Sequence, residues 1–132
     1  MAVVDPLLEP ELYRGRGTVR ARVLAMSADA GRYRVPKASL RASGPFWCLH
    51  STNGNNVLLR THDFETNDAA EMDAALILGR TDELTVVGVH GADKWHSLWV
   101  VLEGEVVLVS GRAWHQGQAR TGAAISRMLR QA

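Results

Sequence analysis

Residues 98–109 read Leu-Trp-Val-Val-Leu-Glu-Gly-Glu-Val-Val-Leu-Val, two apolar runs that meet at Glu103-Gly104. The central dipeptide predicts a tight turn, so the two runs are expected to form a β-hairpin. Side chains alternate between the two faces of a strand, and here both faces are apolar. One face carries Trp99, Val101, Val106 and Leu108, and the other carries Leu98, Val100, Val107 and Val109. Such a hairpin belongs in the middle of a closed barrel or of a sheet that is covered on both sides.

A second hairpin is predicted upstream, where Asn53-Gly54 separates Phe46–Ser51 from Val57–Thr61. Asn-Gly is the favoured sequence for a two-residue type I′ turn, and this turn fixes the pairing of the strands. The expected pairs are Trp47 with Arg60, Cys48 with Leu59, Leu49 with Leu58, and His50 with Val57. A tryptophan opposite an arginine predicts a cation–π contact.

Arginines alternate with apolar residues nearer the N-terminus. Thr18–Met26 is interpreted as a strand with Arg20 and Arg22 on one face, and Arg32–Val35 repeats the pattern with Arg32 and Arg34. If the two strands pair, four guanidinium groups share one face. Like charges side by side are unfavourable unless that face is solvated or meets an anion.

Two helices are expected. Asp68–Leu78 begins with Asp68-x-x-Glu71, the spacing of a capping box, and ends at Gly79. The apolar spacing places Met72, Ala75 and Leu76 on its inward stripe. Gln116–Arg130 forms the second helix, with Ile125, Met128 and Leu129 inward and Arg120 and Arg127 on a common outer face.

With a further strand at Leu84–His90, bent or bulged at Gly88, the order is four strand segments, a helix, three strand segments and a helix. This order predicts an α+β fold: a small, mainly antiparallel β-barrel with one inserted helix and a C-terminal helix. Its connectivity resembles that of the OB-fold, and a two-sheet, pleckstrin-homology-like barrel is the competing interpretation. The chain is expected to be one domain, 1–132, with an N-terminal arm at 1–17, a barrel at 18–111 that contains helix 68–78, and the final helix at 116–130.

Charge is sorted along the chain. Residues 1–44 carry eight Arg or Lys against four Asp or Glu, residues 45–105 carry three against ten, and residues 106–132 carry four against none. The segment charges of +4, −7 and +4 sum to the formal +1. Basic ends around an acidic middle predict a surface for an anion, or for the acidic middle of another copy.

No catalytic motif is found, and we expect no enzymatic activity, no cofactor and no metal. His90, Asp93 and His96 fall close together, but their spacing matches no established ligand motif. Cys48 is the single cysteine and is expected to be a small buried hydrophobe. We expect a cytoplasmic protein without a signal peptide or a membrane span.

Two functions are predicted from these features. The first is a non-enzymatic module that binds single-stranded nucleic acid, with arginines on phosphates and exposed tryptophans stacked on bases. Its predicted contact residues are Arg20, Arg22, Arg32, Arg34, Lys37, Trp47, Arg60 and Trp95. The alternative is a structural subunit of a phage or other multiprotein complex, a homo-oligomer in which basic ends dock on the acidic middle of the next copy, head to tail.

Overall fold

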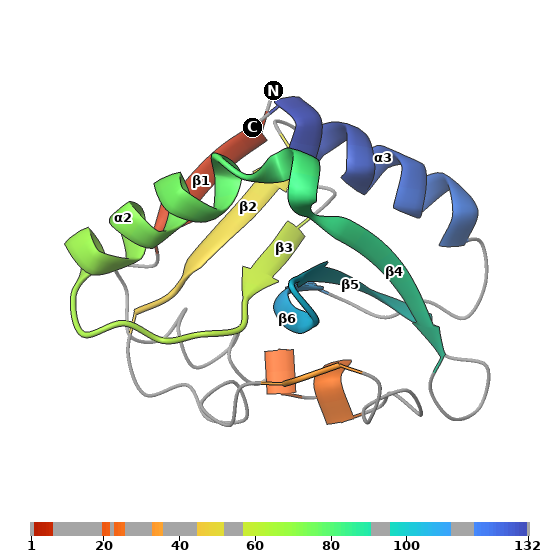
Figure 1. The fold of residues 1–132 in the computed structure, drawn as a ribbon, viewed down its shortest axis with the longest axis horizontal. Helices are drawn as coiled ribbons and strands as arrows, with labels where there is room; N and C mark the ends of the chain where they lie inside the picture. Colours follow the sequence, from red (N-terminus) through yellow and green to blue (C-terminus); the bar gives the residue numbers. More distant parts are fainter. Residues whose placement is uncertain are drawn as a thin grey trace.

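A computed structural model describes residues 2–6, 20–21, 23–25, 33–35, 45–51, 57–90, 96–111 and 118–131. Its strands are β1 (Ala2–Pro6), β2 (Trp47–Ser51), β3 (Val57–Arg60), β4 (Thr85–His90), β5 (His96–Leu102) and β6 (Glu105–Ser110). Its helices are α2 (Asn67–Leu78), the 3-10 turn η2 (Thr81–Glu83) and α3 (Gln118–Gln131). The strands form one sheet in the order β1-β2-β3-β6-β5-β4, and all neighbours are antiparallel (Figure 1).

The α+β class and its antiparallel pairing are confirmed, but the barrel is not. Within the described part of the chain, β1 and β4 are the two edges of an open sheet. The sheet is nevertheless curved, and α3 packs on both edge strands (Figure 1). The C-terminal helix α3 therefore spans β1 and β4, the two edge strands that would pair with each other in a closed barrel.

Both predicted strand pairs form, although Asn53 and Gly54 themselves lie outside the described residues. The register of β2 and β3 is the one that the Asn53-Gly54 turn requires, with Cys48 opposite Leu59 and Leu49 opposite Leu58. At the second turn, Glu103 and Gly104 have φ angles of 53° and 80°. Two consecutive residues with positive φ are typical of a type I′ turn, whose twist matches that of the strands it joins.

A bulge changes the predicted faces of β6. The register of β5 and β6 shifts by one residue between Val100 and Val101, so Val107 is the extra residue between Val106 and Leu108. The alternation of side chains is interrupted there, and Leu108 joins the opposite core cluster from Val106. The sequence predicted a bend or a bulge at Gly88. The bulge is wrong, because β4 pairs with β5 without a shift in register.

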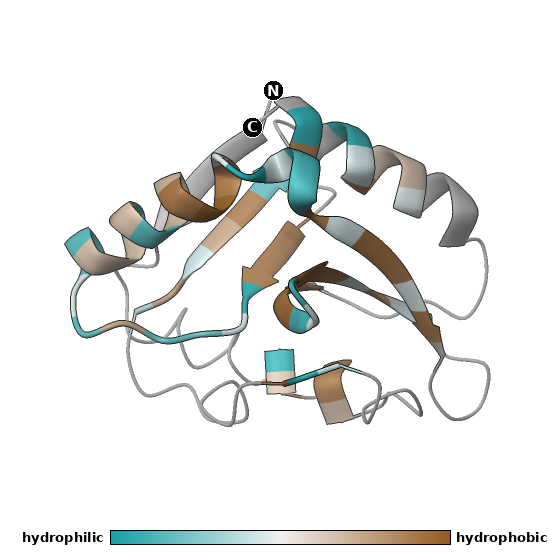
Figure 2. Ribbon diagram, in the orientation of Figure 1, coloured by the Kyte–Doolittle hydropathy of each residue, from teal (hydrophilic) through white to brown (hydrophobic). Residues whose placement is uncertain are grey.

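The sheet is covered on both faces, as the apolar hairpin requires. One core cluster joins the sheet to α2 and α3 through buried residues such as Ala74, Ile77 and Ile125. The other lies on the opposite face, where Val23 and Leu24 are buried with Trp99. In Figure 2, hydrophobic colour runs along the strands and hydrophilic colour marks the segment where α2 leads into β4.

Three N-terminal expectations are changed. The described part of Thr18–Met26 is helical at residues 20–21 and 23–25, so the strand prediction there is wrong. Arg34 forms a single parallel bridge with Glu105 instead of pairing with an upstream strand. Ala2–Pro6, expected to be part of an arm, is the edge strand β1 and pairs with β2. Its proline lies at the end of an edge strand, where a missing N–H donor is tolerated.

No helix in the described ranges combines the length and the apolar character needed to cross a membrane.

Candidate functional site

Helix α2 begins one residue earlier than predicted and has a different cap. The Thr66 side chain accepts a hydrogen bond from the Ala69 amide at 3.1 Å, and the helix ends where the Gly79 amide donates to the Ala75 carbonyl at 3.0 Å. Threonine at this position satisfies an amide that the helix leaves unpaired. Thr66, not Asp68, is therefore the cap, and the Asp68 carboxylate is left exposed on the first turn.

The face that α2 presents to solvent carries two large apolar side chains. Met72 is 69% exposed and Leu76 is 70% exposed, whereas Ala70, Ala74 and Ile77 are buried against the sheet. The predicted inward stripe of Met72, Ala75 and Leu76 is therefore wrong: all three of its residues are exposed. Alanines at the contact let the helix backbone approach the sheet closely, which a larger side chain would prevent.

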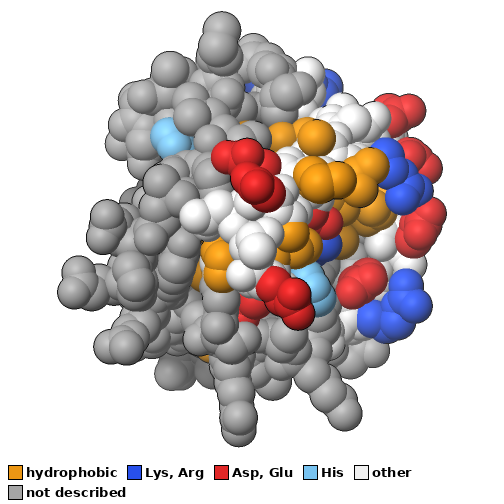
Figure 3. Space-filling model, turned by 90° about the vertical axis from the view of Figure 1, so that its left-hand side faces the viewer, with side chains coloured by type: hydrophobic (Ala, Val, Ile, Leu, Met, Phe, Trp, Pro, Cys, Tyr) orange, Lys and Arg blue, Asp and Glu red, His pale blue; other side chains and the backbone are white. Residues whose placement is uncertain are grey.

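Carboxylates lie beside these apolar side chains. Asp68 precedes Met72 by one helical turn, Glu71 is its neighbour, and both are exposed. In Figure 3, which views the side of the molecule where α2 lies, hydrophobic side chains gather next to acidic ones. We call Asp68, Glu71, Met72, Ala75 and Leu76 the outer face of α2.

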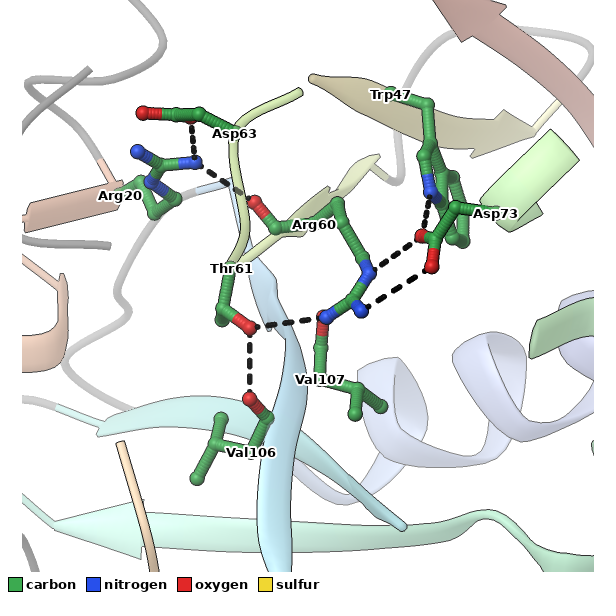
Figure 4. A network of polar contacts seen from close by, with 8 residues as sticks. All are labelled: Arg20, Trp47, Arg60, Thr61, Asp63, Asp73, Val106 and Val107. Atoms are coloured by element: carbon green, nitrogen blue, oxygen red, sulfur yellow. Dashed lines mark hydrogen bonds and ion pairs between the residues drawn. The ribbon is translucent and has the colours of Figure 1, made fainter. Parts of the chain in front are cut away.

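The orientation of α2 is explained by Asp73, which lies on the side of the helix that faces the sheet. Its Oδ2 accepts hydrogen bonds from the indole Nε1 of Trp47 at 2.7 Å and from Nε of Arg60 at 2.8 Å (Figure 4). Nη2 of Arg60 approaches Oδ1 at 3.4 Å. The Arg60 side chain is 11% exposed and that of Asp73 is 18% exposed, so this ion pair is largely removed from water.

Arg60 also connects α2 to the bulge in β6. Its Nη1 donates to the Val107 carbonyl at 3.1 Å and to the Thr61 hydroxyl at 3.3 Å. The Thr61 hydroxyl in turn donates to the Val106 carbonyl at 2.7 Å. The extra residue of the bulge therefore supplies a carbonyl that holds the guanidinium toward Asp73.

A second buried arginine holds the N-terminal helical segment in place. Nη1 of Arg20 donates to Asp63 at 2.8 Å and to the Arg60 carbonyl at 3.0 Å (Figure 4). Its guanidinium lies 4.4 Å from the centre of the Phe46 ring, a cation–π contact. Arg20 is fully buried. A buried guanidinium with a carboxylate, a carbonyl and a ring around it is a structural element of the core.

The predicted contact residues therefore have different surroundings from those expected. Arg20 and Trp47 are buried, so the expectation that their side chains face solvent is wrong. Trp47 and Arg60 do meet, but through the Asp73 carboxylate. Arg34 is exposed, and its Nη2 donates to the Glu103 carbonyl at 2.9 Å. The remaining predicted contacts, Arg22, Arg32, Lys37 and Trp95, lie outside the described residues.

A third charged group ties η2 to the turn between β5 and β6. Arg80 donates to Glu83 at 2.7 Å and to Glu103 at 2.6 Å. The hydrogen bond from Arg80, more than the Coulombic attraction, holds the pKa of Glu83 below its ordinary value. The same two carboxylates raise the pKa of Arg80. All three side chains are well exposed, so this group positions the turn rather than forming a reactive site.

One hollow lies between α3 and the start of β4. Its volume is about 520 Å³. It is lined by Thr81, Asp82, Leu84, Val86, Ser126, Leu129 and Arg130. Its lining mixes one carboxylate and one guanidinium with hydroxyl and apolar groups, so it is suited to water and small polar solutes rather than to an apolar ligand.

Within the described ranges, no group of three or more His, Cys, Asp or Glu side chains is placed to hold a metal ion. Cys48 is buried, as predicted. Comparisons with protein families, with curated proteins and with solved structures found no match to this chain.

Proposed function

We propose that the protein is an assembly subunit that associates with copies of itself through the outer face of α2. The observation that carries this proposal is the exposure of Met72 and Leu76, at 69% and 70%. The two side chains are one helical turn apart and therefore adjacent on the helix surface. Full burial of a Met or Leu side chain is worth about 1.5–3 kcal/mol, so an interface here has a substantial driving force.

The chemistry of this face supports a protein partner. An apolar centre with a charged rim is the common anatomy of a protein interface. Asp68 and Glu71 supply the rim and are both negative. Negative charge at the rim favours a basic partner, sets its orientation and repels polyanions such as nucleic acid.

The nucleic-acid hypothesis stays a prediction, with less support than assembly. Of its eight residues, the structure describes Arg20, Arg34, Trp47 and Arg60. Three of these are engaged inside the fold by Asp63 and Asp73 or by the ring of Phe46, which leaves Arg34 as the exposed one.

Sedimentation analysis tests the proposal directly. Wild-type protein is expected to show mass that rises with concentration, and the double variant Met72→Gln/Leu76→Gln is expected to stay monomeric. The matched control exchanges the two residues, Met72→Leu/Leu76→Met, which keeps the face apolar and is expected to associate like the wild type.

Two results would overturn the proposal. One is a wild-type protein that is monomeric at every concentration; the other is association that the glutamine variant leaves unchanged. The same sedimentation experiment with a labelled single-stranded oligonucleotide added distinguishes self-association from nucleic-acid binding. A monomer that binds it at low salt and releases it at high salt would support the nucleic-acid hypothesis instead.

A further inference from the structure

We infer that the occupant of the outer face of α2 is helix α3 of a second copy of this chain. The inference rests on the proposed assembly function and identifies the surface that the outer face of α2 binds. It commits to a contact between two different helices, which two copies can make once, head to tail, or twice about a two-fold axis.

Helix α3 carries positive charge, whereas the outer face of α2 carries negative charge. Residues 118–131 contain three arginines and no aspartate or glutamate. Ile125 and Leu129 are buried against the sheet, while Ala123, Arg127 and Arg130 are exposed. Because 3.6 residues make one turn, Ala123, Arg127 and Arg130 lie together on the side of the helix opposite Ile125.

The shape of α3 also suits the outer face of α2. Ala123 offers only a methyl group on the face that carries Arg127 and Arg130. Small residues let a partner helix approach closely, and large side chains such as Met72 and Leu76 fit between them. Met72 and Leu76 can therefore approach the backbone of α3 at Ala123.

The spacing along the two helices agrees when they run antiparallel. Met72 follows Asp68 by four residues and Arg127 follows Ala123 by four residues, which is about 6 Å along each axis. If Ala123 is placed beside Met72 and Leu76, Arg127 reaches Asp68 and Glu71. The antiparallel arrangement also brings the positive end of one helix dipole to the negative end of the other.

Both helices pack on the same core cluster, α2 over β1 and β2 and α3 over β4, β5 and β1, and they slope apart (Figure 1). If two copies meet head to tail, one α2 and one α3 remain free at the ends of the pair, and the assembly grows into a ring or a filament. If they meet about a two-fold axis, both α2–α3 contacts form within the pair and the assembly stops at a dimer. The mass of the wild-type assembly in sedimentation analysis distinguishes the two arrangements.

A charge-exchange experiment tests the pairing. The acidic side is reversed by Asp68→Lys/Glu71→Lys, and the basic side by Arg127→Glu/Arg130→Glu. Each double variant alone is expected to weaken self-association by about tenfold or more, because it places like charges across the contact. An equimolar mixture of the two is expected to regain association, since each reversed face then meets a reversed partner.

The matched control is Glu103→Lys, which is compared with the single variant Glu71→Lys: each makes the same change in net charge at an exposed residue, and Glu103 lies in the turn between β5 and β6, on neither α2 nor α3. The control is expected to associate like the wild type and to give no rescue when mixed with Arg127→Glu/Arg130→Glu. Circular dichroism confirms that each variant is folded; if a double variant is not, Glu71→Lys and Arg127→Glu replace it.

Each outcome is decisive. If the α2 variant weakens association and the α3 variant does not, or if the mixture fails to regain it, α3 is not the occupant, although the proposed function stands. If Met72→Gln/Leu76→Gln leaves association unchanged, the proposed function fails and the inference with it.

Discussion

Asp73→Ala is the substitution with the clearest expected cost. It leaves the Arg60 guanidinium, 11% exposed, without its carboxylate, and the buried Trp47 indole N–H without an acceptor. Removing one partner of a buried ion pair costs about 3–5 kcal/mol, and an unsatisfied buried donor costs about 1–3 kcal/mol. The lower ends apply, because Asp73 is 18% exposed and some water reaches the site. The expected loss is about 4 kcal/mol, a large part of the 5–15 kcal/mol typical of a domain.

Urea unfolding followed by tryptophan fluorescence measures this loss. With an m-value of about 2 kcal/mol/M, the midpoint should fall by about 2 M. Asp68→Ala is the matched control, an exposed carboxylate on the same helix, and should lose about 0.3–1 kcal/mol through the helix dipole. A midpoint within about 0.5 M of the wild-type value for Asp73→Ala refutes the assignment of Asp73 as the anchor of α2.

Three further outcomes are expected. Trp47→Phe should destabilise the protein by about 1.5–3 kcal/mol more than Trp99→Phe in urea unfolding. Both indoles are buried, but the Trp47 N–H donates to Asp73, whereas the Trp99 N–H has no acceptor among the described residues. Equal losses would contradict this. Gly104→Ala should cost about 1–2 kcal/mol in the same assay, since Gly104 has a φ of 80°, and an unchanged midpoint would contradict the turn geometry. In an NMR titration the pKa of Glu83 should lie below its ordinary value and return to it in Arg80→Gln; the stabilisation is present above the ordinary carboxylate pKa and is lost as the pH falls through the lowered one.

Local sequence signals predicted the elements that local physics determines. The two strand pairs form with the predicted partners next to Asn-Gly and Glu-Gly, and the Glu103-Gly104 turn has the geometry that its sequence favours. The helices at Asn67–Leu78 and Gln118–Gln131 lie within two residues of their predicted bounds at each end. Coverage of both sheet faces also followed from the apolar hairpin at 98–109, although the bulge at Val107 was not signalled.

Long-range pairs account for what the sequence did not reveal. Arg20 is 43 residues from Asp63 in sequence, and its burial depends on that carboxylate and on the Phe46 ring, so its alternation with Val19 and Ala21 was misleading. In the same way, Asp73 is separated from Trp47 by 26 residues. A periodicity rule treats a charged residue as solvent-facing and cannot register a partner that only the fold brings close.

Helix α2 is where local pattern and observed structure conflict most. The apolar spacing favours burial of Met72 and Leu76, yet the fold buries two alanines and Ile77 and brings Asp73 to Arg60 instead. Turning the helix over would bury the larger side chains, but it would remove the carboxylate from a guanidinium that water scarcely reaches. Such conflicts are expected where a residue serves function rather than stability. The anchor costs the monomer the burial of two large side chains, and binding of a second copy on that face would recover it. Among the described residues, α3 offers a surface with the matching charge.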